Sequence, residues 1–123
     1  MTLVEAIRAL VAGAGVQNVY IVDAPESLLS AGAVVVVPYG ADTYEMLPIG
    51  TQHFQIRVSA ASFAASEALC WRAFHALADK TVTEADRRCV SCVAANQEPF
   101  FLGKEGALYI HEFNVQVTAC WKE

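Results

Sequence analysis

Charged residues are scarce in this chain, and basic ones are the scarcest. Only 17% of the 123 residues are charged, and eight Lys and Arg against thirteen Asp and Glu give a net charge of −5. The longest basic run is Arg87-Arg88. Proteins that bind nucleic acids by ordinary means carry a clustered basic surface. The composition therefore argues against that class of function.

Long apolar runs are also absent. The longest one of interest, Ala33 to Val37, is far shorter than the ~20 residues that a membrane-spanning helix needs. Residues Ala9 to Val16 are apolar and follow Arg8, as in a secretion signal, but Glu5 and the lack of a clean cleavage site argue against that reading. We expect neither a transmembrane protein nor a signal peptide.

The sequence motifs that identify common catalytic sites are missing. No Gly-x-Ser-x-Gly, His-Glu-x-x-His or Walker sequence occurs, and the acidic residues are mostly isolated. Gly13-Ala14-Gly15 resembles a phosphate-binding turn, but it ends a predicted helix and precedes a strand, which is the reverse of the required order. We predict no catalytic, cofactor-binding or metal-binding residues, no cofactor and no enzymatic activity.

The four cysteines do not form a recognisable disulfide or metal framework. Cys70, Cys89, Cys92 and Cys120 lie in a predicted core helix and strands, which favours reduced thiols in a cytosolic setting. Cys89 and Cys92 have the spacing of a redox or zinc pair. In a strand, however, residues three apart point to opposite faces, so we interpret them as ordinary sheet residues.

The three histidines are scattered. His111 falls on the apolar face of the last predicted strand, where it could be a ligand, a base or a hydrogen-bonded core residue, of which the last is commonest. His53 and His75 fall on solvent-facing positions, and no carboxylate lies at a suggestive spacing from either.

Hydrophobic residues, in contrast, are abundant. They make up 55% of a chain whose length suits one domain with one core, so we predict a single domain over residues 1–123. A lone monomer would have difficulty burying so much apolar surface. We therefore expect a sizeable interface between copies.

The first half of the chain predicts one helix and several strands. Thr2-Leu3-Val4-Glu5 has the form of a capping box and starts a helix. We predict a short strand from Asn18 to Val22. The β-branched run from Ala33 to Val37, ended by Pro38, predicts a strand that is buried either on both faces or against a partner chain. Tyr39 to Gly50 predicts a projecting loop or an irregular hairpin.

The second half predicts a strand from His53 to Ala60 with a period of two, and a helix capped by Ser62. Trp71 and Phe74 lie on the apolar stripe of that helix and should be the centre of the core. Further strands follow at Cys89 to Ala95 and Tyr109 to Trp121, the latter with Glu112, Asn114, Gln116 and Thr118 on its wet face. The order predicts an α+β fold, with a mixed or antiparallel sheet and two main helices on one face.

Three segments resemble the minor capsid and tail-terminator proteins of long-tailed bacteriophages and prophages. They are the block from Phe54 to Val58 that runs into Glu67-Ala68-Leu69 and Trp71 to Leu77, the turn Pro99-Phe100-Phe101-Leu102-Gly103-Lys104-Glu105, and the closing strand Tyr109 to Val117 with Phe113-Asn114-Val115. The family's turn usually carries Arg where Lys104 stands, and the Tyr39 to Gly50 segment has no clear counterpart. The match covers roughly the last two thirds of the chain.

The resemblance implies a tail-terminator-like fold and a structural role in the virion, with synthesis in the cytoplasm of the bacterial host. Such subunits form a homo-oligomeric, commonly hexameric ring at the head-proximal end of the tail tube. The ring stops tube growth and docks the neck, so the implied partners are the tail tube protein and neck or head-completion proteins. A head-completion or neck connector protein remains an alternative, as does a small cytosolic enzyme or ligand-binding domain that works in a pocket between subunits.

Two expectations follow for assembly. Ring closure should bury exposed strand edges, for which Ala33 to Val37 is a candidate, so that Val35→Asp would abolish assembly without unfolding the monomer. If acidic side chains line the lumen, genomic DNA would pass through without specific binding, because its phosphates would be repelled.

Overall fold

The computed structural model describes residues 2–43, 49–82, 89–95 and 97–120, with the side chains of residues 89–92 excepted. Ten helices and strands follow one another within these ranges. They are α1 (Leu3–Gly13), β1 (Val19–Ile21), the 3₁₀ turn η1 (Glu26–Leu28), α2 (Leu29–Gly32), β2 (Ala33–Thr43), β3 (Ile49–Ala60), α3 (Phe63–Leu77), β4 (Cys89–Ala95), β5 (Phe100–Glu105) and β6 (Leu108–Cys120).

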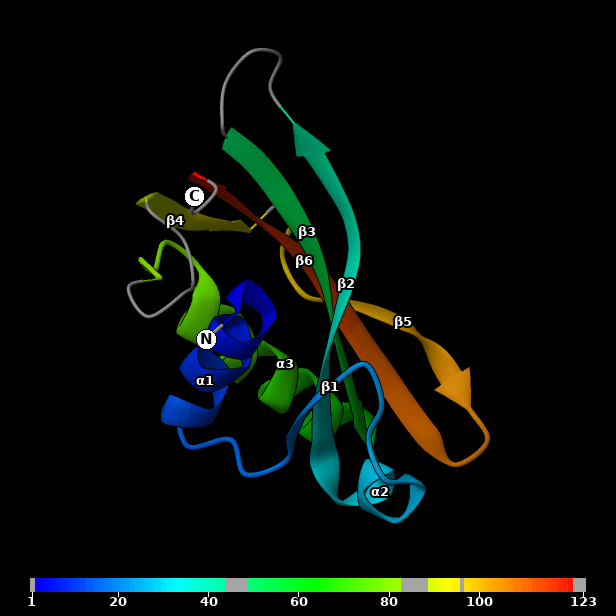
Figure 1. Ribbon diagram of the computed structural model, residues 1–123. Coiled ribbons are helices and arrows are strands. Elements are labelled where there is room, and N and C mark those ends of the chain that lie inside the picture. The colour runs from blue at the N-terminus through cyan, green and yellow to red at the C-terminus, as the bar shows by residue number, and fades with distance from the viewer. Residues whose placement is uncertain (1, 44–48, 83–88, 96, 121–123) are drawn as a thin grey trace.

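The strands form one twisted sheet, and α1 and α3 lie together on one of its faces (Figure 1). The strand order is β1-β2-β3-β6-β4, and β5 lies beside the other half of β6. Only the pair of β1 and β2 is parallel, while the remaining neighbours are antiparallel. The predicted α+β class, with a mixed sheet and two main helices on one face, is confirmed. No helix in the described ranges is long and apolar enough to cross a membrane.

Both main helices begin where the sequence predicts. Thr2 and Glu5 form the reciprocal capping box of α1, and the Ala65 amide donates to the Ser62 hydroxyl at the start of α3 over 3.2 Å. Gly13 is the last residue of α1, and Gly15 adopts a φ of +91° just beyond it. The Gly-Ala-Gly segment is therefore a helix stop, as predicted.

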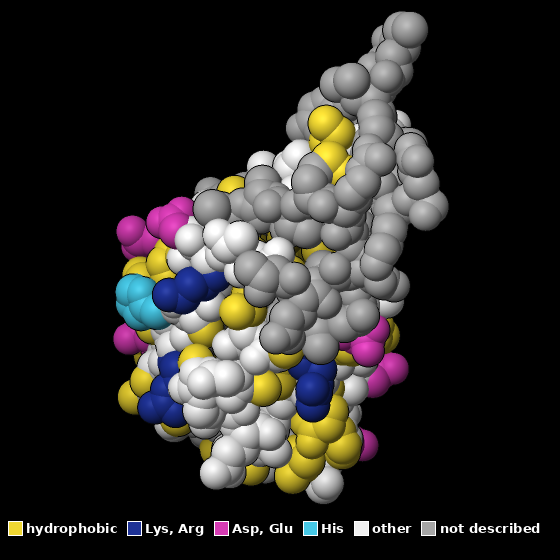
Figure 2. Space-filling view, turned by 60° about the vertical axis from the view of Figure 1, so that its left-hand side comes forward, with side chains coloured by type: hydrophobic (Ala, Val, Ile, Leu, Met, Phe, Trp, Pro, Cys, Tyr) yellow, Lys and Arg dark blue, Asp and Glu magenta, His cyan; other side chains and the backbone are white. Residues whose placement is uncertain are grey.

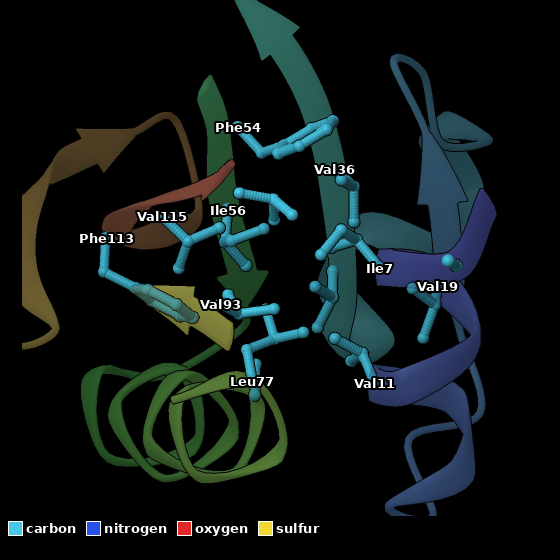
Figure 3. Close-up of a cluster of buried hydrophobic side chains, with 14 of the residues drawn as sticks. Ile7, Val11, Val19, Val36, Phe54, Ile56, Leu77, Val93, Phe113 and Val115 are labelled. Atoms are coloured by element: carbon cyan, nitrogen blue, oxygen red, sulfur yellow. The ribbon is translucent and has the colours of Figure 1, made fainter. Parts of the chain in front are cut away.

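The core lies between the sheet and the two helices. Phe54, Ile56 and Val58 of β3 are fully buried, which confirms the predicted alternation of that strand. Figure 3 shows Phe54 and Ile56 in one cluster with Leu77 of α3 and Ile7 of α1. Burial of this continuous apolar layer is the main source of stability for a fold of this size.

The prediction that Trp71 and Phe74 form the centre of the core is wrong. Both are only partly buried, and the largest fully buried side chains are Phe54 and Phe113. The helix α3 instead faces the sheet with smaller residues, among them Cys70 and Ala73, which are fully buried. Small side chains allow close approach of the helix, and the two large rings are therefore left at its margin.

Strand β2 is longer than predicted, because Pro38 does not end it. The strand continues to Thr43 after a register shift between Pro38 and Gly40. Proline is tolerated at such a bulge since β1 pairs only with Val34 to Val36, so nothing there requires the missing N–H. Together β2 and β3 form an irregular hairpin that extends beyond the helices (Figure 1), as one of the two predictions for Tyr39 to Gly50 anticipated. Residues 44–48 lie outside the described ranges.

The strand edge at Ala33 to Val37 is not open for a partner chain. Val35 is paired with Tyr20 of β1 on one side and with Arg57 of β3 on the other, and its side chain is buried. The alternative prediction, a strand buried on both faces, is the one confirmed for Ala33 to Val36. The assembly expectation placed on this edge is therefore wrong.

Strand β6 carries its core residues on the predicted face. Phe113, Val115 and Val117 are fully buried. Glu112, expected on the wet face, is instead almost entirely buried, because β5 lies beside it with Phe100 in register and Arg57 stands opposite on β3. Trp121 lies outside the described residues.

Candidate assembly surfaces

Of the cysteines whose side chains the structure describes, one is a free thiol and one is in a disulfide. Cys70 is free and buried, and burial raises the pKa of its thiol to about 12, so it behaves as a small hydrophobic residue. Cys120, however, is disulfide-bonded, which corrects the prediction that all four are reduced. Cys89 to Ala95 is a strand, as predicted, with a register shift between Val90 and Val93. The prediction that Cys89 and Cys92 point to opposite faces concerns side chains outside the described set.

His111 is the hydrogen-bonded core residue that the sequence favoured. Its Nδ1 lies 2.8 Å from the Ser66 hydroxyl, and the rings of Phe63 and Phe101 pack against it at 4.8 and 5.3 Å between centroids. Nε2 is buried without a hydrogen-bond partner among the described residues. Burial lowers the pKa of His111, while the charge of Glu67 opposes this shift. The imidazole is therefore neutral and serves as a support beneath two aromatic rings.

Of the other two histidines, His75 is exposed, as predicted, and His53 is half-buried. The His53 Nε2 lies 2.8 Å from the Asp42 carboxylate across the β2–β3 hairpin, although the two residues are eleven positions apart. The carboxylate partner that the sequence spacing did not indicate is thus supplied by strand pairing.

A buried carboxylate lies on the face of the sheet opposite the main helices. Glu112 stands opposite Arg57 in the β3–β6 register, and Arg57 donates from Nη2 to Glu105 Oε1 over 2.6 Å. Glu112 Oε1 has no hydrogen-bond partner among the described residues. Burial raises the pKa of Glu112, and the Arg57 guanidinium opposes that rise. This arrangement ties β3, β5 and β6 together.

The described part of the chain contains no group of three or more His, Cys, Asp or Glu side chains that could hold a metal ion. The titratable residues above act in pairs that join neighbouring elements.

The first candidate assembly surface is an apolar protrusion where β5 meets the start of α3. Phe63, Phe101 and Leu102 are 43%, 44% and 47% exposed, and the rings of Phe63 and Phe101 meet edge to face at 5.1 Å. A bulge between Phe101 and Gly103 displaces Leu102 from the regular pleat. We call these three residues the apolar knob. Exposed apolar groups that are fixed in position are typical of protein contacts.

The second candidate surface is a hollow between α1 and α3, which we call the helix groove. It has a volume of about 780 Å³ and is lined mainly by apolar groups, including Leu10 and Gly13 of α1 and Ala68 and Trp71 of α3. Arg72, His75 and Lys80 also line it. Figure 2, in which this side comes forward, shows Lys and Arg side chains dispersed among hydrophobic ones.

Sequence reasoning missed both surfaces. A usable signal was present in Phe100-Phe101-Leu102, because three consecutive large apolar residues in a strand cannot all point to one face. The helix groove left no comparable signal. It exists only because α3 packs its small residues against the sheet and leaves Trp71 partly exposed.

Comparison with known proteins decides the family. The sequence model of the bacteriophage tail terminator protein family matches residues 10–120. The chain belongs to this family. The match covers the whole sheet and all of α3, but only the end of α1. The chain is thus a structural protein of the phage tail and a component of the phage particle, as the resemblance implied.

The fold is shared with a solved virion protein. A chain in the structure entitled "Virion of native gene transfer agent (GTA) particle" superposes with a TM-score of 0.70 at 14% identity, over 97% of this chain and 95% of that one. At this identity the likeness shows a common fold. No match was found among curated proteins.

Proposed function

We propose that this tail terminator assembles as a ring, most simply a hexamer, at the head-proximal end of the tail tube. There it stops tube growth and offers a docking surface to the neck. The observation that carries the proposal is the apolar knob, which remains exposed on a domain whose core is otherwise complete. Rigid exposed apolar surface on a family of virion proteins is best explained by contacts between subunits.

The decisive experiment uses phage particles that lack this protein. Without the terminator nothing stops growth of the tail tube, so we expect overlong tails by electron microscopy. Supplying the chain from a plasmid should restore tails of normal length. Tails of normal length that fail to join heads would instead identify a neck connector and overturn the terminator role. Light scattering of the purified chain over a concentration series then measures the subunit number of the ring.

The proposed partners are the tail tube protein, the neck proteins and passing DNA. The net charge of −5 supports passage without adhesion, because an acidic surface repels phosphates. Tight, salt-sensitive binding of duplex DNA by the assembled ring, measured by fluorescence anisotropy, would contradict this part of the proposal.

A ligand-binding role in the helix groove is the second candidate. The groove is large and apolar, and Arg72 and Lys80 would suit an anionic group. Mass spectrometry of the native purified protein tests it directly, because a resident small molecule would appear as a mass above that of the chain. We propose that the chain carries no ligand and catalyses no reaction, and that the groove serves assembly.

A further inference from the structure

Contacts with neighbouring side chains fix the two aromatic rings of the apolar knob. Phe63 of α3 and Phe101 of β5 contact each other and both pack on His111, which is fixed in turn by Ser66. Phe101 also lies 6.4 Å from the ring of Tyr109. Side chains that are already ordered lose little conformational entropy when a partner binds. The two aromatic rings of the knob are therefore preorganised for insertion into a complementary hollow.

The helix groove provides a hollow of matching chemistry. Ala68 and Gly13 leave room between the two helices, and the partly exposed ring of Trp71 contributes an apolar wall. Trp71 is supported by Phe74 at 5.3 Å between centroids and by His75 at 5.6 Å. A well-packed apolar hollow that receives large apolar anchors is the usual centre of a stable interface.

The charges around the two surfaces have opposite signs. Three acidic residues accompany the knob: Glu105 ends β5, Glu98 precedes it, and Glu67 lies one helical turn after Phe63. Two basic residues lie among them: Arg57, which pairs with Glu105 over 2.6 Å, and Lys104, over the ring of Tyr109. The acidic excess at the knob therefore comes from Glu67 and Glu98. The groove is lined in part by Arg72, Lys80 and His75, and none of the residues that line it is acidic.

Several of these charges are available to a partner. Arg72 and Lys80 at the groove, and Glu67 and Glu98 at the knob, form no ion pair with any described residue. Complementary charges at the rim of an interface guide association and fix its orientation. The complementarity favours contact between the knob of one subunit and the groove of another over contact between two knobs, which would bring acidic residues together.

The two surfaces are distinct, although α3 contributes to both: Phe63 belongs to the knob, and Ala68 and Trp71 line the groove. In Figure 1, β5 is at the right, α1 is at the left and α3 runs between them. A contact between unlike surfaces leaves one knob and one groove unused in every pair, so further subunits can add until the chain of contacts closes. This is the head-to-tail geometry that a ring requires.

We infer that the occupant of the helix groove is the apolar knob of a second copy of this chain. Phe101 and Leu102 insert between α1 and α3 of the neighbouring subunit, and the acidic residues around the knob meet Arg72 and Lys80. This inference rests on the proposed ring and specifies its subunit contact.

Cross-linking between two differently substituted proteins tests the contact. Leu102→Cys places a thiol on the knob, and Ala14→Cys places one at the exposed end of the helix groove. Each full-length variant is purified and checked for a native circular dichroism spectrum, and the two are then mixed with a short bismaleimide. We expect a cross-linked dimer in the mixture, with each variant alone giving no more dimer than the unsubstituted protein.

A matched control uses Glu26→Cys, an exposed position in η1 away from both surfaces, in place of Ala14→Cys. Equal yields from the control and test mixtures would overturn the inference. Arg72→Glu, added to the Ala14→Cys protein, should lower the dimer yield several-fold at low salt, because it introduces repulsion with the acidic knob. An unchanged yield would contradict the charge pairing.

The cross-linking experiment can overturn the inferred contact without overturning the proposed ring. If light scattering shows a discrete oligomer and the knob and groove do not cross-link, the inferred contact is overturned while the ring stands. If Ala14→Cys cross-links to the tail tube protein and not to Leu102→Cys, the groove belongs to that partner and the inference is again overturned. The length of tails that lack the protein tests the terminator role independently of either outcome.

Discussion

Phe113 is more deeply buried than either large ring on α3. It is fully buried, and its ring meets Phe74 edge to face at 5.5 Å, whereas Trp71 is partly exposed beside the helix groove. We expect Phe113→Ala to lower the free energy of unfolding by about 3–5 kcal/mol, and Trp71→Ala by clearly less. Urea unfolding at equal protein concentration measures both. A larger loss for Trp71→Ala would contradict the assignment of the core.

Glu112 should make stability depend on pH. Because burial raises the pKa of its carboxyl above 4.5, the folded chain holds this proton more tightly than the unfolded chain. The stabilisation from this proton is complete below the pKa of Glu112 in the unfolded chain. It is lost as the pH rises through the higher pKa of Glu112 in the folded chain. Relative to the wild type, Glu112→Gln should therefore be little changed near pH 4 and increasingly stable toward pH 7. Urea unfolding across this range checks it, and a difference between the two proteins that does not grow with pH would contradict it.

At the scale of elements, α3 depends on its first turn. The Ser62 hydroxyl accepts from the Ala65 amide, which would otherwise lack a partner at the helix terminus. Ser62→Ala should lower the free energy of unfolding by about 1 kcal/mol, while Ser62→Asp should retain most of it, because Asp is an equally good cap. Chemical denaturation separates the two outcomes. Equal losses in both variants would show that the cap is not the source of the effect.

Strand β2 shows why an assembly variant must be chosen from the structure. Val35 is buried between β1 and β3, so Val35→Asp should unfold the monomer through an uncompensated buried charge. Val22→Asp makes the same change at a side chain that is 52% exposed, and should leave the circular dichroism spectrum and melting temperature nearly unchanged. A folded Val35→Asp protein would contradict the observed burial.

At the scale of the whole molecule, assembly should be visible in thermal stability. Contacts made only by folded subunits raise the melting temperature as protein concentration increases. We expect this rise in the wild type and in Val22→Asp, and its loss in Leu102→Asp, which places a charge on the apolar knob. Differential scanning fluorimetry over a hundredfold range of concentration measures it. A rise that persists in Leu102→Asp would place the subunit contact elsewhere.

The sequence by itself determined both main helices and the buried face of β3, but not β5, because the pattern predicts a turn over Phe100 to Glu105. Thr2 and Ser62 predicted both helix starts, because capping uses contacts three residues apart, and the alternation around Phe54 predicted the buried face of β3. The family followed from ordered segments of the same local kind. These features depend on neighbours in the chain, so pattern alone reveals them.

Tertiary structure decided everything that depends on distant neighbours. Glu112 is buried because β5 pairs beside it, and the strand edge at Val35 is covered because β1 pairs with it. Trp71 lies at the margin of the core. The knob and the helix groove arise in the same way, from a bulge in β5 and from the close packing of α3. Residue periodicity says which face of an element is apolar, but only the assembled layers determine how much of that face is covered.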